Sequence, residues 1–243
     1  MGSVNLSWPL TQCVKYADDV TIIETIECTS QTLLSMSDIE EIFVSAGLRL
    51  NKNKCKEMII PRSILYFPPP ISADFVRVDI LRILGFALTT NLSWEAQIKD
   101  VLKKASRRLY IIRCLRDSLC KNELISVYHA IITALFIYAS PVYGNLSLVL
   151  LSKLNRFQKR AHRLICGRHC SCNMFDDISD TFLQCGLKLL LNCENPCHPL
   201  STFVPNRLLY TRHFMLPVSH TARRSNSFFP WFCARSNELM CKY

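Results

Sequence analysis

Two adjacent carboxylates near the start of the chain are the feature that most constrains its fold. Asp18 and Asp19 lie between two runs of β-forming residues, at 13–14 and at 20–23. This pattern predicts a strand, a tight turn at the two acids, and a second strand. Such a hairpin exposes both carboxylates at its tip, where they repel each other and gain nothing from burial. Because Mg²⁺ is held by one or two carboxylates together with substrate phosphates, the hairpin is a candidate metal site.

The sequence around this hairpin resembles a known enzyme family. Tyr16-Ala17-Asp18-Asp19 resembles the catalytic motif of reverse transcriptases, and the segments from 14 to 167 resemble the non-LTR (LINE-type) retrotransposon branch in their order. The resemblance implies RNA-directed DNA synthesis, with Asp18 the principal ligand and Asp19 its neighbour. Two Mg²⁺ (or Mn²⁺) ions would stabilise the attacking and leaving oxygens. The implied partners are an RNA template, a DNA primer and deoxynucleoside triphosphates.

Three further positions take their expected roles from this resemblance. Residues 47–56 resemble a motif that packs beside the catalytic hairpin, which places Lys54 near the nucleotide's phosphates. A cation there could neutralise or protonate the leaving pyrophosphate; a solvated basic loop is the alternative. Residues 83–86 resemble the hairpin that grips the primer end, where Gly85 would allow close approach of the nucleic acid. A glycine that only closes a hairpin is the alternative there. The resemblance also assigns Tyr16 to nucleic-acid binding.

One part of the family pattern has no counterpart in the sequence. Family members carry another metal-binding Asp on an earlier strand of the palm, preceded by the fingers. Nothing before Tyr16 can supply either. The sequence therefore predicts the later half of a palm followed by a thumb, inactive as a polymerase on its own.

Helical periodicity replaces strand periodicity from about residue 91. Apolar residues at helical spacing predict helices over 94–116, 122–138 and 152–166, after an earlier packing helix at 29–46. Ser93 is expected to cap the first of the three. The helices at 94–116 and 152–166 carry basic stripes opposite their apolar ones, which suit a phosphate backbone without specifying sequence; solvated basic faces are the alternative. The candidate nucleic-acid-binding residues are Lys99, Lys103, Arg107, Arg108, Arg156, Arg160 and Arg163, and Lys104, Arg113 and Arg116 complete the basic surface.

The stretch from 124 to 151 is long and nearly uncharged, so a membrane span is one reading of it. His129, Pro141 and Gly144 interrupt the stretch, and the continuous apolar part before Pro141 is short for a bilayer. A buried helix is the favoured interpretation, and no membrane partner is expected.

Composition limits the partner and the compartment. The chain of 243 residues has a formal net charge of +10 and a pI near 9.1, which favour a polyanionic partner such as nucleic acid. Thirteen cysteines at irregular spacing, with no signal peptide at the start, are typical of reduced thiols in a nuclear or cytoplasmic protein. Residues 168–243 are Cys-rich and lose periodicity, and their Cys and His spacings do not match a zinc site.

These inferences predict an α+β chain in three parts. Residues 1–90 form a partial palm, an antiparallel hairpin with a packing helix. Residues 91–167 form an α-helical thumb, and residues 168–243 an irregular tail. The expected function is that of part of a retrotransposon reverse transcriptase. A non-catalytic nucleic-acid-binding relic is the alternative, with the membrane reading of 124–151 as a further one.

Overall fold

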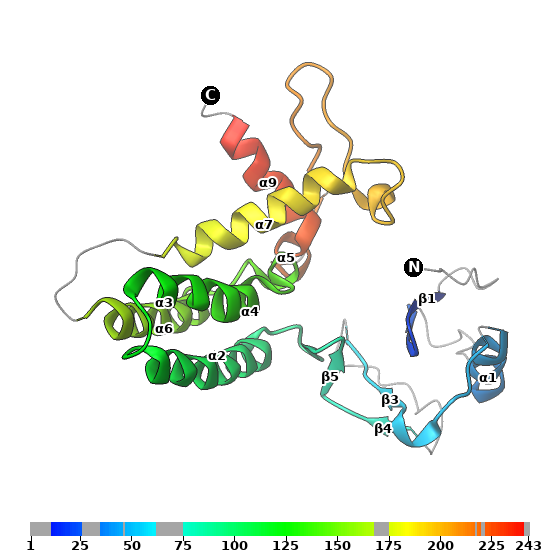
Figure 1. Cartoon of the computed structure of the whole chain (residues 1–243). Coiled ribbons are helices and arrows are strands. Elements are labelled where there is room, and N and C mark those ends of the chain that lie inside the picture. Colours follow the sequence, from blue (N-terminus) through cyan, green and yellow to red (C-terminus); the bar gives the residue numbers. More distant parts are fainter. Residues whose placement is uncertain are drawn as a thin grey trace. The chain divides into compact units, whose positions relative to one another are not determined.

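The computed structural model describes residues 11–25, 35–45, 47–61, 75–167, 175–216, 218–219 and 222–240. These residues form a mixed α+β structure with small two-stranded sheets and many helices. The chain divides into two compact units, Met1–Ser93 and Trp94–Tyr243 (Figure 1). Among these residues, the named strands belong to the first unit and the longer helices to the second.

The first unit begins with the predicted hairpin. Strands β1 (Thr11–Tyr16) and β2 (Asp19–Glu24) pair antiparallel, with Tyr16 opposite Asp19 as the last pair before the turn. Helix α1 (Met36–Ser45) covers one face of the hairpin, because Ile39 and Ile42 pack with Cys13 and with the partly buried side chains of β2. Residues 29–34 and Ala46 of the predicted helix lie outside the described residues.

Shorter elements complete this unit. The 3-10 turn η1 (Lys52–Lys54) leads into β3 (Lys56–Glu57), which pairs in parallel with β4 (Val76–Arg77). Strands β5 (Ile80–Ile83) and β6 (Phe86–Thr89) form a second antiparallel hairpin. Its two turn residues, Leu84 and Gly85, have φ angles of 49° and 80°, as a type I′ turn requires.

Two helices of the second unit carry the basic stripes. Helix α2 (Glu95–Leu115) packs against α3 (Lys121–Tyr128) and against α6 (Leu148–Cys166). Their contact surfaces supply much of the core: Ile98, Val101, Ala105, Leu109, Ile112, Leu124, Leu154, Phe157 and Ala161 are buried. The cap of α2 was predicted wrongly. Trp94 holds the N-cap position without a side-chain bond, while Ser93 uses its carbonyl to accept from Thr89. Helix α6 begins four residues earlier than predicted, at a cap on Ser147.

The helix predicted over 122–138 is interrupted. After α3, residues His129–Thr133 form the π-helical turn η2, followed by the short helices α4 (Ala134–Ile137) and α5 (Ser140–Tyr143). Ala139, at φ 57°, turns the backbone between α4 and α5. Within the described ranges, no helix combines the length and the apolar character that crossing a bilayer would need.

The prediction of an irregular tail after residue 168 was wrong for much of its length. Helix α7 (Ile178–Cys193) packs against α5, α6 and α9 (Phe228–Met240), and η3 (Ser201–Phe203) and α8 (Ala222–Ser225) lie between α7 and α9 in sequence. The buried positions of α7, Ile178, Phe182, Gly186, Leu190 and Cys193, recur at helical spacing, and one of them is a glycine. A Cβ on Gly186 would lie 1.9 Å from ring atoms of Phe232, so the glycine permits close contact of α7 and α9.

A bridged loop at 207–214 lies between these two helices in sequence. Arg207 and Phe214 form a bridge, and the Arg207 guanidinium lies over the Phe214 ring with its Nε 2.6 Å from Glu194 Oε1. The Arg207 Nη1 also donates to the carbonyl of Arg212 at 2.7 Å. These contacts fix the stem, while Leu209 at the tip is 93 % exposed.

Candidate functional site

The tip of the β1–β2 hairpin carries the two carboxylates, with a turn one residue earlier than predicted. Because Tyr16 pairs with Asp19, the two turn residues are Ala17 and Asp18, and Asp19 is the first residue of β2. Two-residue hairpin turns need a positive φ at their first central position, and Ala17 has a φ of 53°. Both carboxylates are exposed.

The register also decides which side chains accompany each acid. Cross-strand partners share a face of the sheet, so Asp19 lies on the face of Tyr16, Val14 and Ile23. All three of these apolar side chains are about half exposed, since α1 covers the opposite face through Cys13. The acids therefore stand at the open end of a sheet face that exposes a tyrosine and two aliphatic side chains.

The hairpin tip has the donor chemistry for Mg²⁺ or Mn²⁺ but supplies a partial ligand set. Its two adjacent, exposed carboxylates are hard oxygen donors of the kind that these ions prefer. Among the described residues, no group of three or more His, Cys, Asp or Glu side chains could hold a metal ion. An ion at Asp18 and Asp19 would therefore need oxygens from water and from a bound phosphate to complete its octahedron.

The structure places Lys54 and Gly85 in separate turns of the same unit. Lys54 is the last residue of η1 and is exposed, and the partly buried Leu50 packs its segment against the core of the hairpin and α1. Gly85 occupies the turn between β5 and β6 with open space on its Cβ side. Its φ of 80° is enough to explain a glycine there.

The predicted cations of α2 divide into two groups. Lys99, Lys103 and Arg107 are exposed, as a phosphate-binding surface needs. Arg108 is half-buried, and its Nη1 donates to the carbonyl of Ile131 in η2. A π-helical turn departs from the regular i to i+4 ladder and leaves carbonyls in need of other donors. The structure thus gives Arg108 a packing role that its sequence neighbours do not share.

Two of the three predicted cations of α6 lie beside α2. Arg156, Arg160 and Arg163 are all exposed. Where α6 packs against α2, the two helices border a groove of about 660 Å³. Its lining residues are Ser106, Leu109, Tyr110 and Arg113 from α2 with Arg160, Arg163 and Leu164 from α6. Tyr110 was not among the predicted site residues, although its spacing of i, i+4 and i+7 with Ser106 and Arg113 places the three on one helix face.

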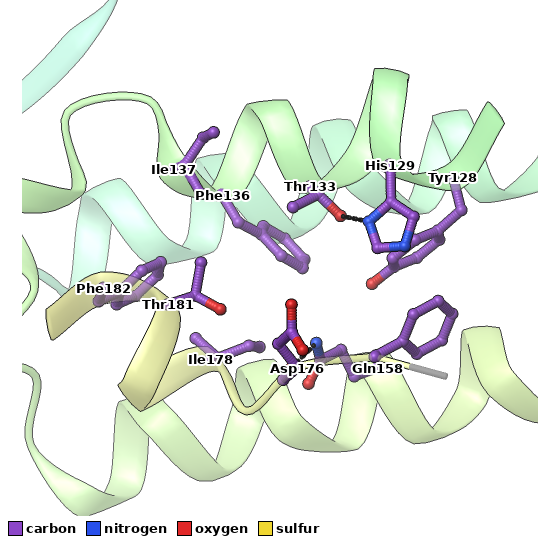
Figure 2. A pocket seen from close by; sticks show the side chains of 11 residues that line it. Tyr128, His129, Thr133, Phe136, Ile137, Gln158, Asp176, Ile178, Thr181 and Phe182 are labelled. Atoms are coloured by element: carbon purple, nitrogen blue, oxygen red, sulfur yellow. Dashed lines mark hydrogen bonds between the residues drawn. The ribbon is translucent and has the colours of Figure 1, made fainter. Parts of the chain in front are cut away.

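A second, smaller pocket lies between η2, α6 and the start of α7. Figure 2 shows the Tyr128 hydroxyl directed into it and a hydrogen bond between His129 and Thr133. His129 Nδ1 lies 3.2 Å from Thr133 Oγ1. The Tyr128 ring stacks on Phe175, and burial raises the pKa of Tyr128 although the Gln158 side chain partly opposes the effect. The enclosed volume of about 40 Å³ has room for water but not for a substrate. This pocket is therefore a packing feature of the helical unit.

The cysteines and histidines of the tail, whose spacings do not match a zinc site, are only partly described. His169, Cys170 and Cys172 lie outside the described residues. Cys193 and Cys233 are buried apolar side chains of the α7–α9 core, and burial raises the pKa of the Cys233 thiol to about 11. These two cysteines therefore act as small apolar groups in the packing.

Comparison of the chain with protein-family models, with curated proteins and with solved structures found no match.

Proposed function

We propose that the chain is part of an RNA-directed DNA polymerase of the non-LTR retrotransposon type. In this proposal the first unit carries the later part of the palm, and the helices from 94 to 167 act as a thumb. The observation that carries the proposal is the β1–β2 hairpin, whose tip displays Asp18 and Asp19 next to each other and exposed. A register one residue different would turn Asp19 onto the face that α1 covers.

The resemblance to reverse transcriptases implies a role for each site residue. Asp18 and Asp19 would hold divalent cations together with the phosphates of a nucleoside triphosphate. Such ions, when bound, stabilise the attacking and leaving oxygens of nucleotidyl transfer. Tyr16, opposite Asp19 on the same face, would contact the nucleic acid next to the reacting end. Lys54 would neutralise charge on the leaving pyrophosphate, and Gly85 would allow the primer to approach the backbone.

A second candidate function is nucleic-acid binding without catalysis. It is favoured by the partial ligand set at the hairpin, where the described residues provide two carboxylates and no third group. The exposed cations of α2 and α6 serve this function equally well. The two candidates differ in what the hairpin does, so the hairpin is the place to test them.

Divalent-ion binding is the first test. With two carboxylates, the chain should bind Mn²⁺ weakly alone and more tightly when a deoxynucleoside triphosphate is present, because phosphate oxygens complete the octahedron. Calorimetric titration of the full chain with Mn²⁺, with and without dTTP, measures this difference. Asp18→Asn should remove the triphosphate-dependent part. Tight binding without triphosphate would reveal a different ligand set, and binding unaffected by Asp18→Asn would refute the proposed metal site.

Primer extension separates the two candidates. The chain on its own is expected to give no template-dependent incorporation with Mg²⁺ or Mn²⁺, since the family's other metal-binding Asp has no counterpart before Tyr16. Incorporation that Asp18→Asn abolishes would contradict the non-catalytic candidate and show that the chain is sufficient for polymerisation.

The cationic stripes of α2 and α6 make a separate prediction. Replacing Lys103, Arg107, Arg156 and Arg160 together by Gln should weaken binding of every nucleic-acid sequence alike. It should also flatten the dependence of log K on log salt by roughly one unit per lost phosphate contact. Folding should persist, because exposed charges contribute little to stability. Unchanged affinity would mean that the stripes are solvated faces.

A further inference from the structure

The groove between α2 and α6 concentrates positive charge at one place. Arg113 from α2 and Arg160 and Arg163 from α6 line it, and all three side chains are exposed. No acidic side chain is among the described residues that line the groove. Elsewhere in the described chain, arginines at 77, 116, 207 and 235 have carboxylate partners close by. Three guanidinium groups on one groove repel each other, so the groove is matched to an anion with more than one charge.

An exposed aromatic ring stands among these cations. Tyr110 is 67 % exposed, and it lies on the face of α2 that also carries Ser106 and Arg113. The aliphatic side chains of Leu109 and Leu164 lie in the same lining. An exposed tyrosine ring gains by stacking on another flat ring, and phosphate alone provides none.

An unpaired nucleotide satisfies both features together. In a duplex the bases are stacked inside and the surface offers phosphates, so the duplex would leave the Tyr110 ring unused. A single strand offers phosphates to a basic groove and base faces to an aromatic side chain at the same time. A volume of about 660 Å³ falls within the range of small-ligand pockets, so the groove has room for part of such a strand.

We propose that this groove binds single-stranded nucleic acid, with one base stacked on Tyr110 and adjacent phosphates paired with Arg113, Arg160 and Arg163. The Ser106 hydroxyl is placed to donate to a phosphate or a sugar oxygen. This inference deepens the proposed nucleic-acid binding of the helical unit and rests on it. It does not depend on the hairpin carboxylates.

The test compares single-stranded and duplex probes on the full chain. Fluorescence anisotropy at fixed salt measures affinity for labelled 12-mers of oligo(dT) and oligo(U) and for a 12-base-pair DNA duplex. Tyr110→Ala should weaken binding of the single strands about tenfold, the size expected for one lost base stack. It should leave duplex affinity unchanged, and Tyr110→Phe should keep wild-type affinity for all probes. Tyr210→Ala is the matched control, since Tyr210 is a fully exposed tyrosine outside the groove.

The arginines provide the second arm. Arg113→Gln combined with Arg163→Gln should weaken single-strand binding and reduce its salt slope by about 0.7 for each lost phosphate contact. Far-ultraviolet circular dichroism of each variant confirms that the helices remain. Comparison of oligo(dT) with oligo(U) shows whether the groove prefers DNA or RNA. A stronger effect of the substitutions on the affinity for either strand supports the groove.

Several outcomes would overturn the inference. Tyr110→Ala could weaken the binding of single strands and of duplex equally, or weaken neither. The groove would then bind phosphates without a stacked base. Displacement of the oligonucleotide by polyglutamate at equal charge concentration would assign the groove to acidic peptides. Wild-type binding to the duplex alone would defeat this inference and leave the proposed charge-driven binding intact. If the polymerase proposal is wrong, a different measurement shows it: Mn²⁺ binding will not depend on the triphosphate.

Discussion

The two units of the molecule differ in how much apolar surface they bury. Among the described residues of the first unit, the main core cluster consists of Cys13, Ile39 and Ile42 with partly buried neighbours. The second unit buries large side chains from α2, α3, α4, α5, α6, α7 and α9, including Tyr128, Tyr143, Phe182 and Phe232. Because burial of apolar area is the main favourable term in folding, the second unit holds most of the stability.

The residues that indicate a chemical function and the residues that form the larger core therefore lie in different units. Asp18 and Asp19, the motif that most clearly indicates a chemical function, lie in the unit with the smaller core. The unit with the larger core carries the exposed cations of α2 and α6. A substitution in the helical unit should therefore act mainly on folding or on nucleic-acid affinity, and one in the hairpin on local geometry or on divalent-ion binding.

The largest expected effect is the loss of Phe232. This ring is 1 % exposed and contacts the rings of Phe228 and Trp231. Phe232→Ala should lower the free energy of unfolding of the helical unit by about 3–5 kcal/mol, from lost transfer free energy and a cavity. Urea denaturation followed by circular dichroism measures this loss. The exposed control Leu209→Ala should change stability by less than about 0.5 kcal/mol.

Hydrogen exchange makes the same variant a test of the two units. Amides of β1 and β2 should exchange at the wild-type rate in Phe232→Ala, while those of α7 and α9 lose protection. Equal loss of protection in both units would mean that they fold as one.

Two neighbouring arginines provide an intermediate effect. Arg108 donates to the Ile131 carbonyl of η2, whereas Arg107 is exposed. Arg108→Met should cost about 1.5–3 kcal/mol of stability, since the bond has a charged donor and its loss orphans a carbonyl. Arg107→Met should leave stability nearly unchanged and weaken nucleic-acid binding instead. Thermal unfolding and oligonucleotide affinity, measured on both variants, test this division; similar stability losses in both would contradict it.

The smallest expected effect concerns the hairpin turn. Ala17 has a φ of 53°, a region that costs a residue with a Cβ roughly 1–2 kcal/mol. Ala17→Gly removes that cost, although it also adds some flexibility to the unfolded chain. The free energy of unfolding of the hairpin should therefore rise by about 0.5–1 kcal/mol. The readout is slower hydrogen exchange in β1 and β2. The matched control is Ala161→Gly in α6, where the same change should destabilise by about 1 kcal/mol; a destabilised hairpin would mean that another turn is formed.

Much of the local structure could be predicted from the sequence. Alternation around Asp18 and Asp19 predicted the hairpin, and helical spacing of apolar residues predicted the helices that became α2 and α6. Both signals depend on residues a few positions apart, which a short window contains in full. The prediction failed at 178–193, where the structure forms α7 with buried residues at helical spacing.

The sequence alone therefore determined the β1–β2 hairpin, the helices α2 and α6, and which side chains carry charge or metal-binding oxygens. The tertiary structure decided what each of these side chains can do. Arg108 and Arg107 are adjacent in the chain, yet packing of α2 against η2 gives one a carbonyl partner and leaves the other exposed. Packing of α2 against α6 likewise joins Tyr110 and Arg113 to Arg160 in one groove. These outcomes depend on neighbours that lie far apart in the sequence, and long-range packing, not local periodicity, brings such neighbours together.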